Sequence, residues 1–117
     1  MGTKLILTIA LLFALVASPL AAGDQAKDTI AVTAQRFYFS PNEITVKKGQ
    51  EVKLIIRSKD VSHGLLIEDL GVKSEIKKGQ TTEVMFTPET AGTFEGKCAH
   101  FCGSGHGSMR FTVHVTE

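Results

Sequence analysis

The sequence from residue 98 to residue 109 reads "CAHFCGSGHGSM" and leads directly into "RFTVHV" at residues 110–115. It contains two cysteines, two histidines and a methionine, separated only by Ala, Phe, Ser and Gly. The main candidate ligands are Cys98, Cys102, His106 and Met109, spaced four, four and three residues apart. Thiolates and thioethers are soft donors and imidazole is borderline, so this set suits copper better than calcium, magnesium or manganese. The stretch therefore predicts a metal-binding loop that ends at a β-strand.

Zinc and a disulfide are the two alternatives to copper at this loop. Structural zinc sites prefer four Cys or His ligands, whereas a Met after the last His indicates a weak axial bond to copper. A bridge between Cys98 and Cys102 without metal is the simplest interpretation of two cysteines in an exported protein. Upstream, His63 stands at the start of an expected strand in "DVSHGLLI". Alone it would be an ordinary surface or capping histidine; beside the loop it is a candidate ligand that closes the site.

Alternating apolar residues predict β-strands in the rest of the chain. The alternating sets are Ile30, Val32 and Ala34; Val52, Leu54 and Ile56; Val84 and Phe86; and Phe111, Val113 and Val115. Turn-forming residues separate them at 40–42, 47–50, 58–60, 77–80 and 88–92, with "KKGQ" in the second and fourth turns. No long stretch beyond the N-terminal segment has helical periodicity. Short strands at this spacing predict an all-β sandwich.

The N-terminal segment predicts export. Residues 5–23 carry no charge and end in small residues, which is typical of a secretory signal peptide over residues 1–22. An uncleaved anchor is the alternative, because an uncharged run of about 18 residues can span a bilayer. Pro19 shortens the apolar core and favours cleavage. We therefore expect an extracytoplasmic protein, periplasmic or secreted, that contacts a membrane only if this segment is retained.

Residues 23–117 are enough for one domain with one core. The chain has 13 Lys and Arg against 12 Asp and Glu, and one of the lysines is Lys4, so the domain itself has balanced charge. This balance predicts no nucleic-acid partner. The sequence also contains no phosphate-binding lysine motif and no serine nucleophile motif.

The segments "DVSHGLLI" (60–67) and "GTFEGKCAHFCGSGHGSM" (92–109) resemble the CuA domain of subunit II of haem-copper oxidases. The similarity runs over residues 29–115 and includes "QRFYFSPNEITVKKGQ" (35–50). A mononuclear blue-copper protein of the same cupredoxin fold needs one loop cysteine, whereas two at this spacing resemble the two-copper site. The resemblance implies a Greek-key β-sandwich with two copper ions that passes single electrons.

The resemblance also implies a role for each candidate ligand. Cys98 and Cys102 would bridge the two copper ions, and His63 and His106 would be the terminal imidazoles. Met109 would be a weak thioether ligand to one ion, and the backbone carbonyl of His100 a weak ligand to the other. The family usually has Glu, Gln or Trp where His100 stands, so its side chain is expected to face solvent, a partner or the metal.

Further features bear on the partner. The family is normally preceded by a transmembrane hairpin and commonly has a surface aromatic as its electron entry, whereas this chain has one leader and no Trp. We therefore expect a free-standing CuA-like cupredoxin. Tyr38 and Phe101 are possible electron-entry substitutes, although packing roles are favoured for both. His114 alternates with Val113 and Val115 and is expected to point outward.

We expect an electron carrier rather than an enzyme in its own right, with a cytochrome or a terminal oxidase as its redox partner. The alternative is copper storage or delivery to a copper-accepting protein through the same ligands, since soft donors also bind Cu(I) well.

Overall fold

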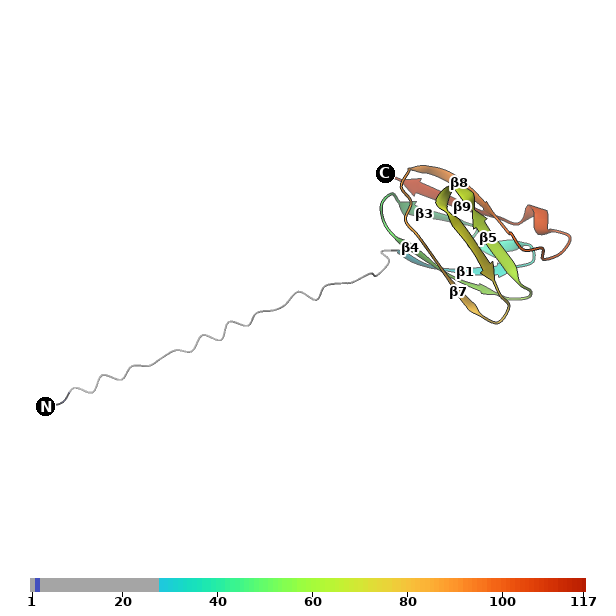
Figure 1. Cartoon of the computed structure of the whole chain (residues 1–117), viewed down its shortest axis with the longest axis horizontal. Coiled ribbons are helices and arrows are strands. Elements are labelled where there is room, and N and C mark those ends of the chain that lie inside the picture. The colour runs from blue at the N-terminus through green and yellow to red at the C-terminus, as the bar shows by residue number, and fades with distance from the viewer. Residues whose placement is uncertain (1, 3–27) are drawn as a thin grey trace.

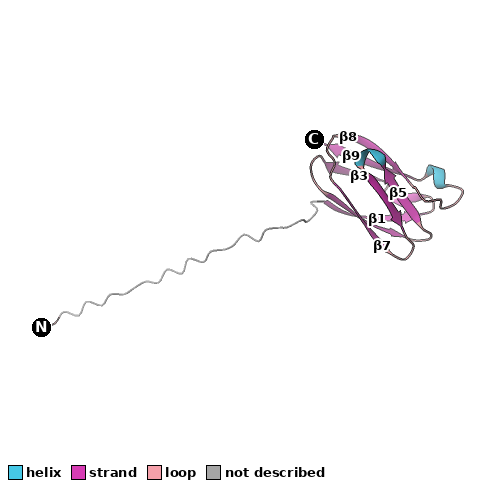
Figure 2. Ribbon diagram, in the orientation of Figure 1, coloured by secondary structure: helices cyan, strands magenta, loops and turns pink. Residues whose placement is uncertain are grey.

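The computed structural model describes Gly2 and residues 28–117. Apart from Gly2, the predicted signal peptide over residues 1–22 lies outside the described residues, so its cleavage stays a prediction. None of the described residues belongs to a helix long and apolar enough to cross a membrane. Residues 28–117 form two β-sheets that pack face to face, as Figures 1 and 2 show. The predicted all-β sandwich is confirmed.

The described part of the chain contains nine strands and two single-turn 3-10 helices. The first sheet has the order β2, β1, β4, β7, with bounds Tyr38–Ser40, Asp28–Gln35, Val52–Ser58 and Thr81–Phe86. The second has the order β3, β9, β8, β5, β6, with bounds Glu43–Lys47, Arg110–Thr116, Gly92–Lys97, His63–Ile67 and Val72–Ile76. Helix η1 spans Glu68–Leu70 and η2 spans His106–Ser108. Strand β1 runs parallel to β4 and β3 runs parallel to β9, so the chain crosses repeatedly between the sheets.

The core lies between the two sheets and follows the alternation of the sequence. Val52, Leu54 and Ile56 of β4 are fully buried, because every second side chain of a strand points to the same face. From the opposite sheet, Phe111 packs edge to face against Phe39, with ring centroids 5.7 Å apart. Such pairs contribute about 0.5–1.5 kcal/mol beyond the area that they bury.

The two KKGQ turns adopt the same local conformation at opposite ends of the sandwich. Gly49 and Gly79 have φ of 79° and 77°, a left-handed conformation that favours glycine. The first turn follows Lys47, which pairs with Thr116 at the end of β9. The second follows Ile76, which pairs with His63 at the start of β5. The second turn therefore lies at the same end as the candidate metal loop, and the first at the far end.

The expected packing roles of Tyr38 and Phe101 are wrong. Tyr38 is 48% exposed because it points outward from the short edge strand β2, where Phe39 takes the core position. Phe101 is 75% exposed because its loop extends beyond the ends of the strands that form the core.

Candidate metal centre

The candidate metal loop, residues 98–109, connects β8 to β9 at the right-hand end of the domain in Figure 1. The base of the loop is closed by the backbone N–H of Cys98, which donates to the carbonyl of Met109 at 3.1 Å. The N–H of Ala99 donates to the carbonyl of Gly64 at 3.3 Å, which attaches the loop to the start of β5. A Cβ at Gly64 would lie 3.1 Å from the backbone nitrogen of His100. This close approach of loop and strand brings His63 to the two cysteines.

Two thiols form the centre of the site. The Sγ atoms of Cys98 and Cys102 lie 3.9 Å apart, and both cysteines are free in the structure. The Nδ1 atom of His63 lies 3.8 Å from Cys98 Sγ. One ligand atom from each of these three residues lies within 4.8 Å of the others, so the structure places the predicted distant histidine beside both thiols.

The remaining candidate donors surround the same two sulfurs. The Nδ1 atom of His106 and the Sδ atom of Met109 lie 3.7 Å and 4.0 Å from Cys102 Sγ. The thiol of Cys98 donates to the backbone carbonyl of His100 at 3.2 Å. The His100 side chain itself is exposed. All six predicted donor atoms therefore lie close together. For His100, the atom beside a thiol is the backbone carbonyl oxygen and not a ring nitrogen.

Burial differs across the site. His63 and Met109 are fully buried, and Cys98 and Cys102 are 3% and 4% exposed. The ring of His106 is half-buried and lies beside the exposed ring of Phe101, with centroids 5.7 Å apart. Solvent and any partner thus reach the site on its His106 side, while the His63 side faces the core.

Asp60 orients His63 from the side opposite the thiols. Its Oδ1 lies 2.8 Å from Nε2 of His63, so the ring donates Nε2–H and leaves Nδ1 directed at Cys98 as an acceptor. Burial alone would raise the pKa of Asp60. Hydrogen bonds from the backbone of Arg36, from His63 and from the backbone of Val61 outweigh burial and lower this pKa to about 2. Hydrogen bonding of a ligand histidine to a carboxylate is the usual way in which proteins fix its tautomer.

The turn between β1 and β2 covers the loop. The guanidinium Nε of Arg36 donates to the carbonyl of Cys102 at 2.9 Å. The ring of Phe37 lies against the loop glycines, so a Cβ at Gly103 or Gly105 would fall 2.9 Å or 2.4 Å from the nearest ring atom. These glycines therefore let an aromatic ring pack on the loop.

Asp60, Arg36 and Phe37 were not predicted as site residues. The sequence did contain an indication of the role of Asp60, because this residue stands three positions before His63 within a predicted turn. Arg36 and Phe37 had none, since they lie more than 60 residues before the loop that they contact.

The donor set fits a thiolate-bound metal. Two sulfurs that share one metal at the zinc–thiolate length can be up to about 4.6 Å apart, and the observed 3.9 Å is within that limit. Burial, followed by the neighbouring Cys98 thiol, raises the pKa of Cys102 to about 11. Metal binding must therefore displace a proton from this thiol. Soft sulfur with imidazole and a thioether favours copper over zinc, which lacks a preference for thioether ligands.

His114 lies outside the site, as expected. Its ring points outward from β9, where Nδ1 lies 3.2 Å from the hydroxyl of Thr93 and Nε2 lies 3.7 Å from a carboxylate oxygen of Glu43.

The comparisons with known proteins agree with this fold and this site. The model of the cupredoxin-like domain family matches residues 5–109, and the chain belongs to that family. The chain is 35% identical over 89 residues to cytochrome c oxidase subunit 2 of Thermus thermophilus, and this alignment covers 76% of the chain and 66% of that protein. It is 34% identical over 93 residues to nitrous-oxide reductase of Cupriavidus necator, covering 76% of the chain and 14% of the reductase.

A solved structure confirms the fold. The periplasmic domain of subunit II of the cytochrome oxidase of Bradyrhizobium japonicum superposes with a TM-score of 0.73 at 24% identity, covering 80% of this chain and 86% of that one. The predicted resemblance to oxidase subunit II is confirmed by these relatives. The chain spans only 66% and 14% of the lengths of the two relatives named above.

Proposed function

We propose that the protein carries single electrons through a CuA-type site of two copper ions. The observation that carries the proposal is the pair of thiols 3.9 Å apart with one imidazole nitrogen beside each sulfur. Cys98 and Cys102 would bridge the ions, and His63 and His106 would be the terminal ligands. Met109 and the carbonyl of His100 would be the weak ligands. When bound, the copper pair supplies the centre that one electron enters and leaves.

The surrounding chain supports electron transfer by holding the ligands in place. His63 is fixed by Asp60, and the loop is fixed by Arg36 and by the ring of Phe37. Ligands held by such contacts keep nearly the same positions in both oxidation states, so little rearrangement opposes the transfer. The complete burial of His63 and Met109 favours retention of copper over its delivery to another protein.

The setting of this activity is part of the proposal. Residues 23–117 would form one exported domain after removal of residues 1–22, and the protein would act outside the cytoplasm. Its redox partner would be a cytochrome or a terminal oxidase, since relatives of the chain are oxidase subunits.

Metal counting and spectroscopy test the proposal together. Reduced, metal-free protein is loaded with copper, and we expect two copper ions per chain with the spectrum of one unpaired electron shared by both ions. Cys98→Ser or Cys102→Ser should abolish this spectrum, whereas His114→Ala should preserve it. One metal per chain with zinc bound in preference to copper would refute the proposed site.

A transfer experiment separates the carrier from a copper donor. The copper-loaded protein is mixed without oxygen with a metal-free copper acceptor, and the two are separated for metal analysis. We expect the copper to stay with this protein through repeated reduction and oxidation. Stoichiometric loss of copper without redox turnover would favour delivery instead.

A further inference from the structure

We propose that the metal end of the domain is a docking surface for an acidic partner protein. The surface consists of the exposed ring of Phe101 and four exposed basic side chains, which we call the basic rim: Arg36, Lys59, Lys77 and Lys78. The identification of the partner as a redox protein rests on the proposed function; the charge and shape of the surface do not.

Three separate turns bring the basic rim to one end of the sandwich. Arg36 follows β1, and Lys59 follows β4 and donates its backbone N–H to the carbonyl of Ala34 at 2.9 Å. Lys77 and Lys78 belong to the second KKGQ turn. The backbone of Lys78 donates to the hydroxyl of Ser62, next to His63, at 3.2 Å.

Asp60, the acid within this end, offsets only one of the four positive charges of the rim and forms no ion pair with a rim side chain. The carboxylate of Asp60 is occupied by the N–H groups of Arg36 and Val61 and by the ring of His63. None of the four rim side chains forms an ion pair with another of the described residues. The exposed acid of the flanking strand, Glu75, points from the outer face of β6.

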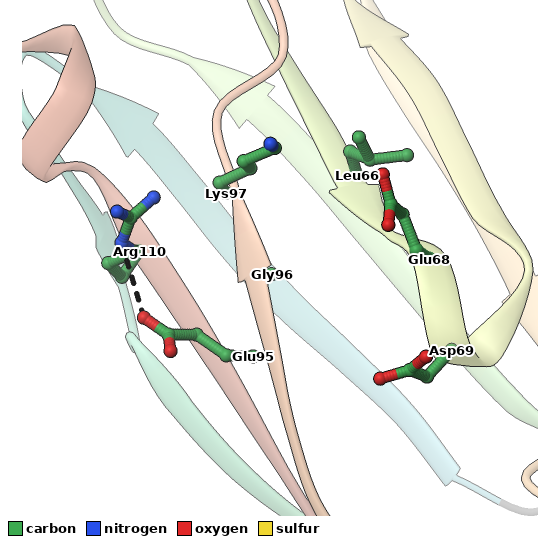
Figure 3. Close-up of a pocket in the computed structure, with 7 residues that line it drawn as sticks. All are labelled: Leu66, Glu68, Asp69, Glu95, Gly96, Lys97 and Arg110. Carbon is green, nitrogen blue, oxygen red and sulfur yellow. Dashed lines mark ion pairs between the residues drawn. The ribbon is translucent and has the colours of Figure 1, made fainter.

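Other basic residues near the loop are excluded from the rim because they are paired or face elsewhere. Figure 3 shows Arg110 in an ion pair with Glu95 at 3.2 Å, inside a polar pocket on the outer face of the second sheet. Lys97 lines the same pocket, together with Glu68 and Asp69.

The far end of the domain has the opposite character. Its two turn lysines are accompanied by four acids at neighbouring strand ends and turns: Asp28, Glu51, Glu89 and Glu117. Lys48 pairs directly with Glu117 at 3.4 Å. Because the domain has balanced charge overall, this segregation of charge orients an acidic partner toward the metal end during encounter.

An apolar contact area lies next to the basic rim. Phe101, 75% exposed, and Val61 line a shallow depression of about 250 Å³ that also reaches Arg36 and Cys102. An exposed aromatic beside a depression is typical of the centre of a protein interface, and charged side chains are typical of its edge. A protein fits this surface better than an anionic membrane does, because the depression beside Phe101 and Val61 offers a shaped apolar contact that a flat lipid surface would leave unfilled.

The two KKGQ turns provide a matched pair of variants. The metal-end variant combines Lys77→Glu with Lys78→Glu, and the far-end variant combines Lys47→Glu with Lys48→Glu. Both change the same motif by the same charge. The probes are a small acidic c-type cytochrome and a small basic one. Binding is followed by NMR titration at ionic strengths of about 0.01 M and about 0.15 M, where the Debye length falls from roughly 30 Å to 8 Å.

We expect the acidic cytochrome to bind and to shift the amide signals of residues 98–109. Binding should weaken at the higher ionic strength, and should weaken by about tenfold in the metal-end variant but by less than twofold in the far-end variant. Phe101→Ser should weaken binding without changing its salt dependence. Thermal melts confirm that each variant is folded.

Two results with the cytochromes would overturn the docking surface: tighter binding of the basic cytochrome than of the acidic one, or an equal loss of affinity in both double variants. Vesicles of anionic lipid are the third probe. Binding to these vesicles that depends on Lys77 and Lys78, with no binding to the acidic cytochrome, would also overturn it. The titration is repeated on the metal-free protein. Failure to take up two copper ions with cytochrome binding intact would refute the proposed function and leave the docking surface standing.

Discussion

Gly105→Ala tests whether the packing of Phe37 on the metal loop stabilises the domain. Gly105 has φ of −92° and ψ of 8°, a conformation that alanine can adopt. Its new Cβ would lie 2.4 Å from Cδ2 and 2.5 Å from Cγ of Phe37, about 1 Å closer than an ordinary carbon–carbon contact. Because Cγ lies on the Cβ–Cγ bond about which the Phe37 ring turns, rotation of the ring cannot relieve both contacts. The loop or the β1–β2 turn must move.

The cost follows from this forced movement. Overpacking by one methyl group typically costs about 1–3 kcal/mol, and each kcal/mol lowers the melting temperature of a domain of this size by roughly 4–8 °C. Gly107→Ala is the matched control from the same loop, because a Cβ at Gly107 meets nothing within 4 Å. We expect it to leave the free energy of unfolding unchanged or to raise it by up to about 1 kcal/mol.

Thermal unfolding of the metal-free variants, followed by circular dichroism, measures both effects. Phe37→Ala removes both the Cδ2 and the Cγ atoms that the new Cβ would meet, so Gly105→Ala should cost less stability in the Phe37→Ala background, and the double-mutant cycle gives the coupling between the two sites. Copper-loaded Gly105→Ala should also release copper to a chelator faster than the wild type. Equal melting temperatures for Gly105→Ala and Gly107→Ala would refute the role given to Phe37.

Three further predictions concern protons and ligands. Because the pKa of Cys102 is raised to about 11, copper affinity measured against a chelator should increase with pH, by up to about tenfold per pH unit for each proton displaced. The lowered pKa of Asp60 contributes stability that is present above pH 4 and is lost as the pH falls toward 2. In metal-free Asp60→Asn, the free energy of unfolding should therefore decrease less steeply with falling pH over that window than in the wild type. The same pH profile in both proteins would contradict this expectation. Met109→Leu nearly conserves volume, so it should change metal-free stability by less than about 1.5 kcal/mol while voltammetry of the copper-loaded protein shows a shifted potential.

The sandwich and the donor cluster could be predicted from the sequence because both depend on short spacings. The period of two in Val52, Leu54 and Ile56 reports directly which side chains face the core. The donors from residue 98 to residue 109 lie on one loop, so their proximity needed no knowledge of the fold. The assignment of His63 needed only the expectation that a strand end meets that loop.

The supporting contacts could not be predicted because they join segments that are distant in sequence. Arg36 and Cys102 are 66 positions apart, and no periodicity records that their turn and loop meet. The exposure of Phe101 has a similar origin: an aromatic residue usually indicates packing, but the ring lies on a loop that extends past the ends of the core strands. Asp60 is the exception, since its spacing from His63 was visible within "DVSH".

Arg36 connects the supporting contacts of the metal centre to the proposed docking surface. Its backbone N–H donates to Asp60 at 2.7 Å, and Asp60 in turn orients His63. Its side chain donates to the carbonyl of Cys102, so a single turn residue acts on both sides of the thiol pair. Arg36 is also part of the basic rim, where a partner would approach. A substitution of Arg36 would therefore disturb ligand geometry and docking together, whereas the lysines of the second KKGQ turn report on docking alone because they contact no candidate ligand.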